Sequence, residues 1–274
     1  HQVLTRRPGG WPLTVFLTPT QHAPIFAGTY FPKQPRYGMP GFDDVLQQVA
    51  DHYQENRDQM PGHAQAMRDA LQQFEPQSLG DSVPSTKLLL QARDQLLKQF
   101  DVRFGGFGDA PKFPHPTYLS LLLRFAKEQP LKKKSLQAVE HTLQAMAQGG
   151  LYDQLQGGFY RYSVDEAWVI PHFEKMLYDN AQLLSLYADA ATVTGQRYFS
   201  QIAQETADWV LSEMQSFEGC YFSTLDADSE DAEGCYYLWD ESQLSSILSE
   251  NELAAITTLY GIKGTPNFEG RWHL

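Results

Sequence analysis

Three residues that could support acid–base chemistry follow one another at helical spacing in the middle of the chain. Pro171 suits the first turn of a helix, and His172, Lys175 and Asp179 then lie three and four residues apart, on one face of that helix. A base that titrates near neutral pH would stand beside a cation and a carboxylate, which is typical of acid–base catalysis. The alternative is an ordinary surface pair of Lys175 and Asp179, with His172 as a capping residue.

An acidic cluster at residues 226–233, Asp-Ala-Asp-Ser-Glu-Asp-Ala-Glu, lies between two aromatic runs and is typical of the tip of a β-hairpin. It is not an EF-hand calcium loop, because Asp231 stands at the sixth position, where such a loop needs glycine. We expect residues 230–233 to form a solvated turn. Asp226 and Asp228 emerge from the end of a strand, so we expect them to face the same site as His172.

A third candidate is the run Ala-Pro-Lys-Phe-Pro-His-Pro at residues 110–116, in which three prolines restrict the backbone. Lys112 and His115 are its polar groups and are candidates for ligand binding. The alternative is that the run is a rigid structural crossover.

These candidates lie in or beside loops that resemble one another, rich in glycine and aromatic residues. The loops contain Phe104–Phe107, Gly157–Tyr160, Glu218–Tyr221 and Asn267–Gly270. From Phe107 to Phe159 is 52 residues, to Tyr221 a further 62 and to Phe268 a further 47, with two helical stretches between successive loops. Such a unit predicts a ring of helical hairpins whose corresponding loops gather at one end. Arg161, Asp165, His172 and Asp228 should therefore converge on one mouth.

The first part of the chain has a different pattern. Two short apolar runs, at residues 13–17 and 24–30, are separated by a tight turn and predict an antiparallel hairpin, and a helix begins near Phe42. This order resembles the C-terminal half of a thioredoxin fold, in which a cis-proline precedes a strand, so we predict a cis Trp11–Pro12 bond. We place this part at residues 1–76, followed by a partial barrel of hairpins at 77–274, with a linker at residues 75–84.

Composition limits the classes of function. The 274 residues carry a net charge of −12, which disfavours nucleic acid as a partner. No apolar run is long enough for a membrane helix, and residues 1–8 contain no apolar core of a signal peptide, so we predict a cytoplasmic protein. We predict no metal and no cofactor. The first residue is not methionine, and we expect an upstream segment and further hairpins in the full-length chain.

The two cysteines, Cys220 and Cys235, form no Cys-x-x-Cys motif, which fits a reducing compartment. We predict a hairpin that pairs residues 220–225 with 234–239. In that register Cys220 faces Trp239, so both thiols should be free.

Five motifs together resemble the spermatogenesis-associated protein 20 family. They are Gly-Gly-Trp-Pro-Leu-Thr-Val-Phe-Leu-Thr-Pro (9–19), Gly-Thr-Tyr-Phe-Pro (28–32), Phe-Gly-Gly-Phe-Gly-Asp-Ala-Pro-Lys-Phe-Pro (104–114), Pro-His-Phe-Glu-Lys-Met-Leu-Tyr-Asp-Asn-Ala (171–181) and Leu-Asp-Ala-Asp-Ser-Glu (225–230). The resemblance implies a thioredoxin-like domain followed by an (α/α)6 barrel, like those of N-acylglucosamine 2-epimerases and six-hairpin glycosidases. The family's Cys-His-Trp-Cys-His motif is not among these residues.

Two functions follow as hypotheses. In a sugar epimerase or isomerase, His172 and His115 would be the bases; in a glycoside hydrolase, Asp165 and Asp228 would be the carboxylate pair. The side chains expected to hold a small sugar ligand are Arg161, Tyr162, Trp168, Asp179, Asp226, Lys112 and His115, with Tyr160 in the aromatic wall and Lys175 beside the catalytic groups. The alternative is a thiol redox or protein-interaction protein that acts through its thioredoxin-like domain, with the barrel as a binding module.

Overall fold

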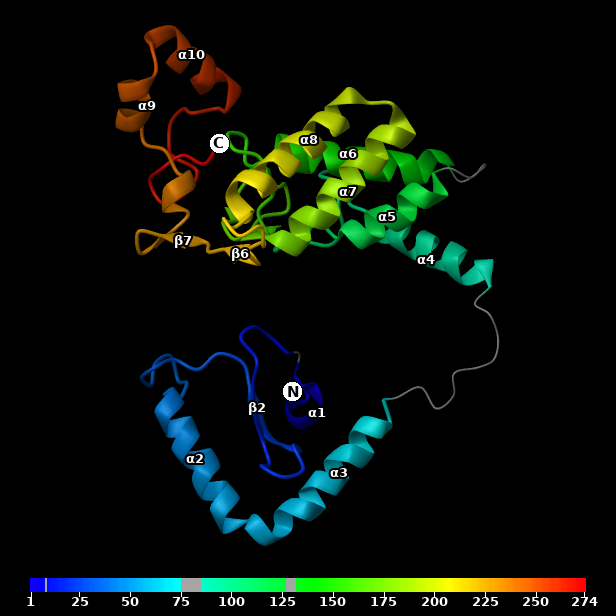
Figure 1. Ribbon diagram of the computed structural model, residues 1–274, viewed down its shortest axis with the longest axis vertical. Coiled ribbons are helices and arrows are strands. Elements are labelled where there is room, and N and C mark those ends of the chain that lie inside the picture. The colour runs from blue at the N-terminus through cyan, green and yellow to red at the C-terminus, as the bar shows by residue number, and fades with distance from the viewer. Residues whose placement is uncertain (8, 75–84, 127–131) are drawn as a thin grey trace. The chain divides into compact units, whose positions relative to one another are not determined.

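The computed structural model describes residues 1–7, 9–74, 85–126 and 132–274, and it divides into two compact units, His1–Val83 and Pro84–Leu274 (Figure 1). The predicted boundary between residues 76 and 77, and the predicted linker at 75–84, lie outside the described residues. Within the described ranges, no helix combines the length and the apolar character that crossing a membrane requires.

The first unit is a two-stranded sheet with helices. β1 (Thr14–Leu17) pairs antiparallel with β2 (Pro24–Gly28), as predicted, and short helix α1 (Gln2–Thr5) precedes them. Helix α2 (Phe42–Glu55) follows, then a 3-10 turn, Arg57–Gln59, and α3 (Met60–Gln72). The buried apolar side chains of this unit are those of Ala23, Ala27, Val45, Met60 and Ala64. The Trp11–Pro12 peptide bond is cis, which confirms that prediction.

The second unit consists mainly of helical hairpins. Its elements are α4 (Thr86–Gln99), α5 (Pro116–Phe125), α6 (Lys132–Gln148), α7 (Leu177–Thr194), α8 (Arg197–Trp209) with a π-helical turn at Val210–Met214, α9 (Glu241–Ile247) and α10 (Glu250–Leu259). α5 packs on α6, α7 on α8, and α5 also on α7, as Figure 1 shows. In α8 the buried side chains recur at helical spacing from Phe199 through Ile202 to Trp209, and this stripe faces the core.

Two of the connecting loops repeat in atomic detail. Asp101 Oδ1 accepts the backbone N–H groups of Arg103 and Phe104 at 2.9 and 3.1 Å. Asp153 lies fifty-two residues later, and its Oδ1 accepts the backbone N–H groups of Leu155 and Gln156 at 3.0 and 3.1 Å. Each loop then closes with two glycines at positive φ. The sequence repeat of 52 residues is therefore also a repeat of hydrogen bonds.

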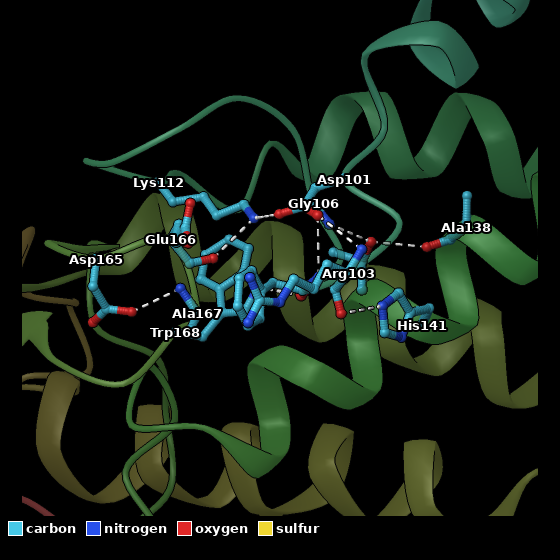
Figure 2. A network of polar contacts seen from close by, with 12 residues as sticks. Asp101, Arg103, Gly106, Lys112, Ala138, His141, Asp165, Glu166, Ala167 and Trp168 are labelled. Atoms are coloured by element: carbon cyan, nitrogen blue, oxygen red, sulfur yellow. Dashed lines mark hydrogen bonds and ion pairs between the residues drawn. The ribbon is translucent and has the colours of Figure 1, made fainter.

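A buried lysine completes each of these loops. Lys112 Nζ lies 2.5 Å from Asp101 Oδ2 and donates to the carbonyl of Glu166 at 2.9 Å (Figure 2). Lys175 Nζ lies 2.8 Å from Asp153 Oδ2 and donates to the carbonyl of Gly157 at 3.0 Å. Each ion pair thus ties a glycine loop to the next part of the chain.

Three short antiparallel strand pairs connect the loops of this unit, and the second of them joins segments about fifty residues apart. β3 (Tyr162–Ser163) pairs with β4 (Pro171–His172), β5 (Lys175–Met176) with β6 (Thr224–Leu225), and β7 (Asp228–Ser229) with β8 (Ala232–Glu233). The prediction of a helix that starts at Pro171 is therefore wrong: α7 begins at Leu177, because residues 171–172 pair with β3 and residues 175–176 pair with β6. His172, Lys175 and Asp179 consequently do not share a helix face.

The acidic cluster forms a tighter hairpin than predicted. Glu230 and Asp231 are its two turn residues, with φ of 54° and 63°, so the pairing of 220–225 with 234–239 is wrong. The chain leaves the hairpin through a 3-10 turn, Cys235–Tyr237, and Trp239 bridges to Trp272 instead. Cys220 and Cys235 are free thiols, as predicted.

Candidate functional site

His172 stands between two carboxylates. Its Nδ1 lies 2.7 Å from Glu233 Oε1, and its Nε2 lies 3.7 Å from Glu174 Oε2. A carboxylate accepts hydrogen bonds, so this network assigns a proton to Nδ1. Residues 171–176 alternate between buried and partly exposed positions, as a strand does, and His172 and Glu174 therefore share the partly exposed side. The side chain of His172 remains 28% exposed, which leaves its ring accessible.

Arg161 links this pair to helix α7. Its backbone N–H donates to the carbonyl of Glu174 at 2.9 Å, and its Nε lies 3.6 Å from Glu174 Oε2. Its Nη1 donates to the hydroxyl of Tyr178 at 2.6 Å. Glu174 thus lies between a histidine and a fixed guanidinium.

An aromatic strip runs from His172 across the loops to α5; we define it as His172, Tyr162, Phe113, His115 and Tyr118. Successive ring centroids lie 5.0, 4.8, 6.3 and 4.7 Å apart, and the two histidines each stack nearly parallel on a tyrosine, at 21° and 8°. Phe113 and Tyr118 are 38% and 39% exposed, so part of the strip is open to a ligand.

Asp179 on α7 adds a carboxyl group whose proton is held tightly. Burial raises the pKa of Asp179 to about 6; the Arg161 guanidinium opposes this rise, and the Glu174 carboxylate adds to it. Near neutral pH this group exchanges between an acid and a base, as a general acid–base catalyst requires.

The raised pKa of Asp179 predicts a pH-dependent cost in stability. The folded state binds this proton more tightly than the unfolded chain, so the stabilisation is complete below about pH 4 and is lost as the pH rises through about 6. Asp179→Asn should therefore raise the free energy of unfolding at pH 7.5 by about 1 kcal/mol, after allowance for solvent screening, and change it little at pH 4. Urea unfolding at both pH values measures this difference. Asp189→Asn, on the exposed face of the same helix, is the control; an equal gain at both pH values would contradict the assignment.

Asp165 is engaged by its own loop. Its carboxylate accepts hydrogen bonds from the backbone N–H groups of Ala167 at 2.7 Å, Val169 at 3.1 Å and Ile170 at 2.7 Å. These bonds use most of its lone pairs to shape the turn that carries Trp168 into the core.

Three other residues expected in the site are core residues. Lys112, Lys175 and Trp168 are each 0% exposed, and Trp168 Nε1 donates to the carbonyl of Phe104 at 2.9 Å (Figure 2). None of them reaches the open strip, and the expectation that they contact ligand is corrected. For Lys175 the pairing of β5 with β6 decides this, because alternate side chains of residues 171–176 point inward.

The segment that carries His172 and the hairpin after Thr224 come together as predicted. The residue that joins them is Glu233, which the sequence analysis placed in a solvated turn. Asp228 pairs across its hairpin with Glu233, and Glu233 contacts His172. Asp226 and Asp228 themselves are exposed, and neither His172 nor Asp228 lines the cavity at Tyr160 and Tyr237. Glu174, Tyr178 and Phe113 also belong to the site and were not among the predicted residues; the 171–181 motif contains the first two.

Comparisons with known proteins cover both units. A family model for DsbH-type thioredoxin-like proteins, described as a protein of unknown function, DUF255, matches residues 1–72. The chain is 36% identical over 254 residues to spermatogenesis-associated protein 20 of Rattus norvegicus, covering 88% of this chain and 32% of that protein. The Homo sapiens protein of the same name is 35% identical over 263 residues, covering 92% and 33%. The chain thus spans about a third of the length of these curated relatives.

Solved structures with a similar arrangement include cellobiose 2-epimerase from Spirochaeta thermophila, with a TM-score of 0.42 and 24% identity over 57% of this chain and 42% of that chain. A D-mannose isomerase has a TM-score of 0.40 and 15% identity, covering 52% and 40%.

The fold class predicted from the sequence is confirmed. The first unit matches a thioredoxin-like model, and the second is built of packed helical hairpins. Identity near 35% extends over about nine-tenths of the chain, so it includes both units rather than one shared domain. The chain is therefore similar in both units to spermatogenesis-associated protein 20, which confirms the resemblance that its five motifs predicted.

Proposed function

We propose that the cluster around His172 performs acid–base chemistry on a carbohydrate, of the kind carried out by sugar isomerases and epimerases. The observation that carries this proposal is the position of His172, hydrogen-bonded to Glu233 at 2.7 Å and stacked at the end of the exposed aromatic strip. Aromatic faces bind the C–H face of a sugar ring, and charged groups beside them bind its hydroxyls. The strip and the cluster supply both.

The reaction needs a base, a group that stabilises negative charge and a proton donor. With Nδ1–H of His172 donated to Glu233, Nε2 keeps its lone pair and can remove the proton from the carbon beside the sugar carbonyl. The electron pair of that C–H bond moves to the carbonyl oxygen and forms an enediolate, which the Arg161 guanidinium stabilises. Return of a proton, from Asp179 or from the imidazolium of His172, restores the carbonyl with no net redox change.

The contacts of Asp165 favour this chemistry over hydrolysis. A hydrolase with Asp165 and Asp228 as its carboxylate pair would need both free to face a glycosidic bond. The backbone donors of its own loop occupy Asp165. Residues 1–83 contain no cysteine, so they supply no thiol for redox chemistry.

We propose a cytoplasmic setting for this activity. Both cysteines are free thiols, which fits a reducing compartment, and the net charge of −12 makes a small neutral ligand a better partner than a nucleic acid.

Proton exchange into D2O tests the proposal with a panel of sugars. We expect the chain to replace the hydrogen beside the carbonyl of at least one probe among glucose, mannose, fructose, N-acetylmannosamine and cellobiose, as seen by loss of its proton NMR signal. His172→Gln keeps a hydrogen-bonding side chain but removes the base, and should lower the exchange rate about 100-fold. His63→Gln, the same change on an exposed face of α3, should leave the rate unchanged. Exchange that survives in His172→Gln, or no exchange with any probe, would refute the assignment.

A further inference from the structure

Tyr178 carries a hydroxyl group that the proposed reaction leaves unused. Its oxygen accepts a hydrogen bond from Arg161 Nη1 at 2.6 Å, and the guanidinium carbon lies 5.6 Å from the centroid of the tyrosine ring. The Nε of Arg161 lies 3.6 Å from Glu174 Oε2, and that carboxylate oxygen lies 3.7 Å from His172 Nε2. The hydroxyl therefore belongs to the same polar cluster as the proposed base.

The direction of the hydrogen bond from Arg161 leaves the tyrosine proton available. A guanidinium has donors and no acceptor, so Tyr178 accepts from Arg161, and the bond uses one of the two lone pairs of the hydroxyl. The phenolic proton must then point elsewhere, and among the described residues no group accepts it. Tyr178 is 49% exposed, so its side chain is open to a ligand.

Two buried tyrosines show how a hydroxyl with a purely structural role is bonded in this unit. Tyr152 donates to Glu205 Oε2 at 2.6 Å, and Tyr187 donates to the carbonyl of Leu143 at 2.7 Å. Both of these protons are used inside the protein. The hydroxyl of Tyr178 differs, because it is held as an acceptor and keeps its donor for another partner.

The backbone that carries Tyr178 is fixed by strand pairing. Met176 pairs with Thr224 between β5 and β6, and the N–H of Leu177 donates to the carbonyl of Ser223 at 2.9 Å. Helix α7 begins at Leu177, so Tyr178 lies in its first turn. A side chain on such a fixed backbone is positioned more accurately than one on a loop, as a group that acts on a substrate requires.

We infer that Tyr178 is a further catalytic residue, which donates its phenolic proton to the sugar oxygen on which negative charge develops. The inference rests on the proposed function, because it assigns one step of that reaction. As His172 Nε2 removes the proton from carbon, the electron pair of the C–H bond moves to the carbonyl oxygen, and that oxygen takes the proton of Tyr178. The phenolate left behind lies against the Arg161 guanidinium, which stabilises its charge. The reverse transfers return both protons, so the step needs no co-reactant.

Exchange into D2O, with the sugar that the parent chain exchanges fastest, tests this role. Tyr178→Phe keeps the ring and removes the hydroxyl. It should lower the maximal exchange rate about 100-fold, while the KM for the sugar changes less than about twofold. Tyr221→Phe is the matched control, because Tyr221 is 44% exposed and its hydroxyl accepts a hydrogen bond from Gln215 Nε2 at 3.2 Å. This variant should exchange at the parent rate.

A fluorinated side chain separates proton donation from the positioning of Arg161. In Tyr178→3-fluorotyrosine the phenol is a stronger acid and a weaker hydrogen-bond acceptor. At a pH at which both phenols keep their proton, this variant should exchange about threefold faster than the parent, because proton donation follows the acidity of the donor. A role limited to holding Arg161 predicts an equal or lower rate, and that result would overturn the inference.

The outcomes also distinguish this inference from the proposed function. Exchange that is lost in His172→Gln but kept in Tyr178→Phe would refute the role of Tyr178 and leave His172 as the base. A parent chain that exchanges no sugar of the panel would refute both.

Discussion

Replacement of Lys175 by methionine is expected to lower the free energy of unfolding of the helical unit by about 3–5 kcal/mol. The ammonium group is 0% exposed, pairs with Asp153 and donates to the carbonyl of Gly157. Methionine fills a similar volume, so the loss does not come from a cavity. It comes from Asp153, whose carboxylate is 7% exposed and would be left buried without a counter-ion.

The double variant Lys175→Met/Asp153→Asn separates this charge effect from packing. Asparagine keeps an acceptor for the N–H groups of Leu155 and Gln156 but carries no charge. The double variant should therefore be about 2 kcal/mol more stable than Lys175→Met alone, as measured by urea unfolding followed by near-ultraviolet circular dichroism. Equal losses in the two variants would show that packing, not the orphaned charge, decides the stability.

The first lysine of the repeat gives an internal comparison. Lys112 is equally buried, but its partner Asp101 is 22% exposed. Water can solvate Asp101 after Lys112→Met, so this variant should lose less stability than Lys175→Met. Both lysines are fully buried, so the difference in stability between the two variants depends on how exposed the partner aspartate is.

The parts of the fold that were predictable from the sequence have local signals. The loops that follow Asp101 and Asp153 were found from their glycine and aromatic residues, since each of them closes with two glycines at positive φ. The first β-hairpin was found from two apolar runs around a short turn. These elements depend on residues close in sequence, and they appear as predicted.

The inward or outward direction of the site residues was not predictable in this way. Lys175 and His172 are both polar, so a hydrophobicity pattern does not distinguish them, yet Lys175 is buried and His172 is partly exposed. Their directions follow from the pairing of β4 and β5 with β3 and β6, of which β6 is about fifty residues away. Glu233 was missed for the same reason, because the residue that it contacts, His172, lies 61 positions earlier in the sequence.

The second glycine of each repeated loop, Gly106 or Gly158, packs closely against a buried tryptophan, and substitution there tests how tight this packing is. Gly158 has φ of +78°, and a Cβ there would lie 2.5 Å from the ring of Trp209. That ring is 2% exposed and is surrounded by the core, so it has little room to move. Alanine at this position would have to adopt a left-handed conformation and also displace the ring.

Gly158→Ala is expected to cost about 2–5 kcal/mol, the sum of about 1–2 for left-handed backbone and about 1–3 for overpacking. Gly195→Ala is the matched control, because Gly195 has φ of +73° but no atom within 4 Å of its Cβ position. It should lose only the backbone part, about 1–2 kcal/mol. The difference between the two variants in urea unfolding isolates the contact with Trp209. If the two losses were equal, the ring would have yielded without cost, and the close packing of the loop on α8 could not be what holds the neighbouring Asp153–Lys175 pair in place.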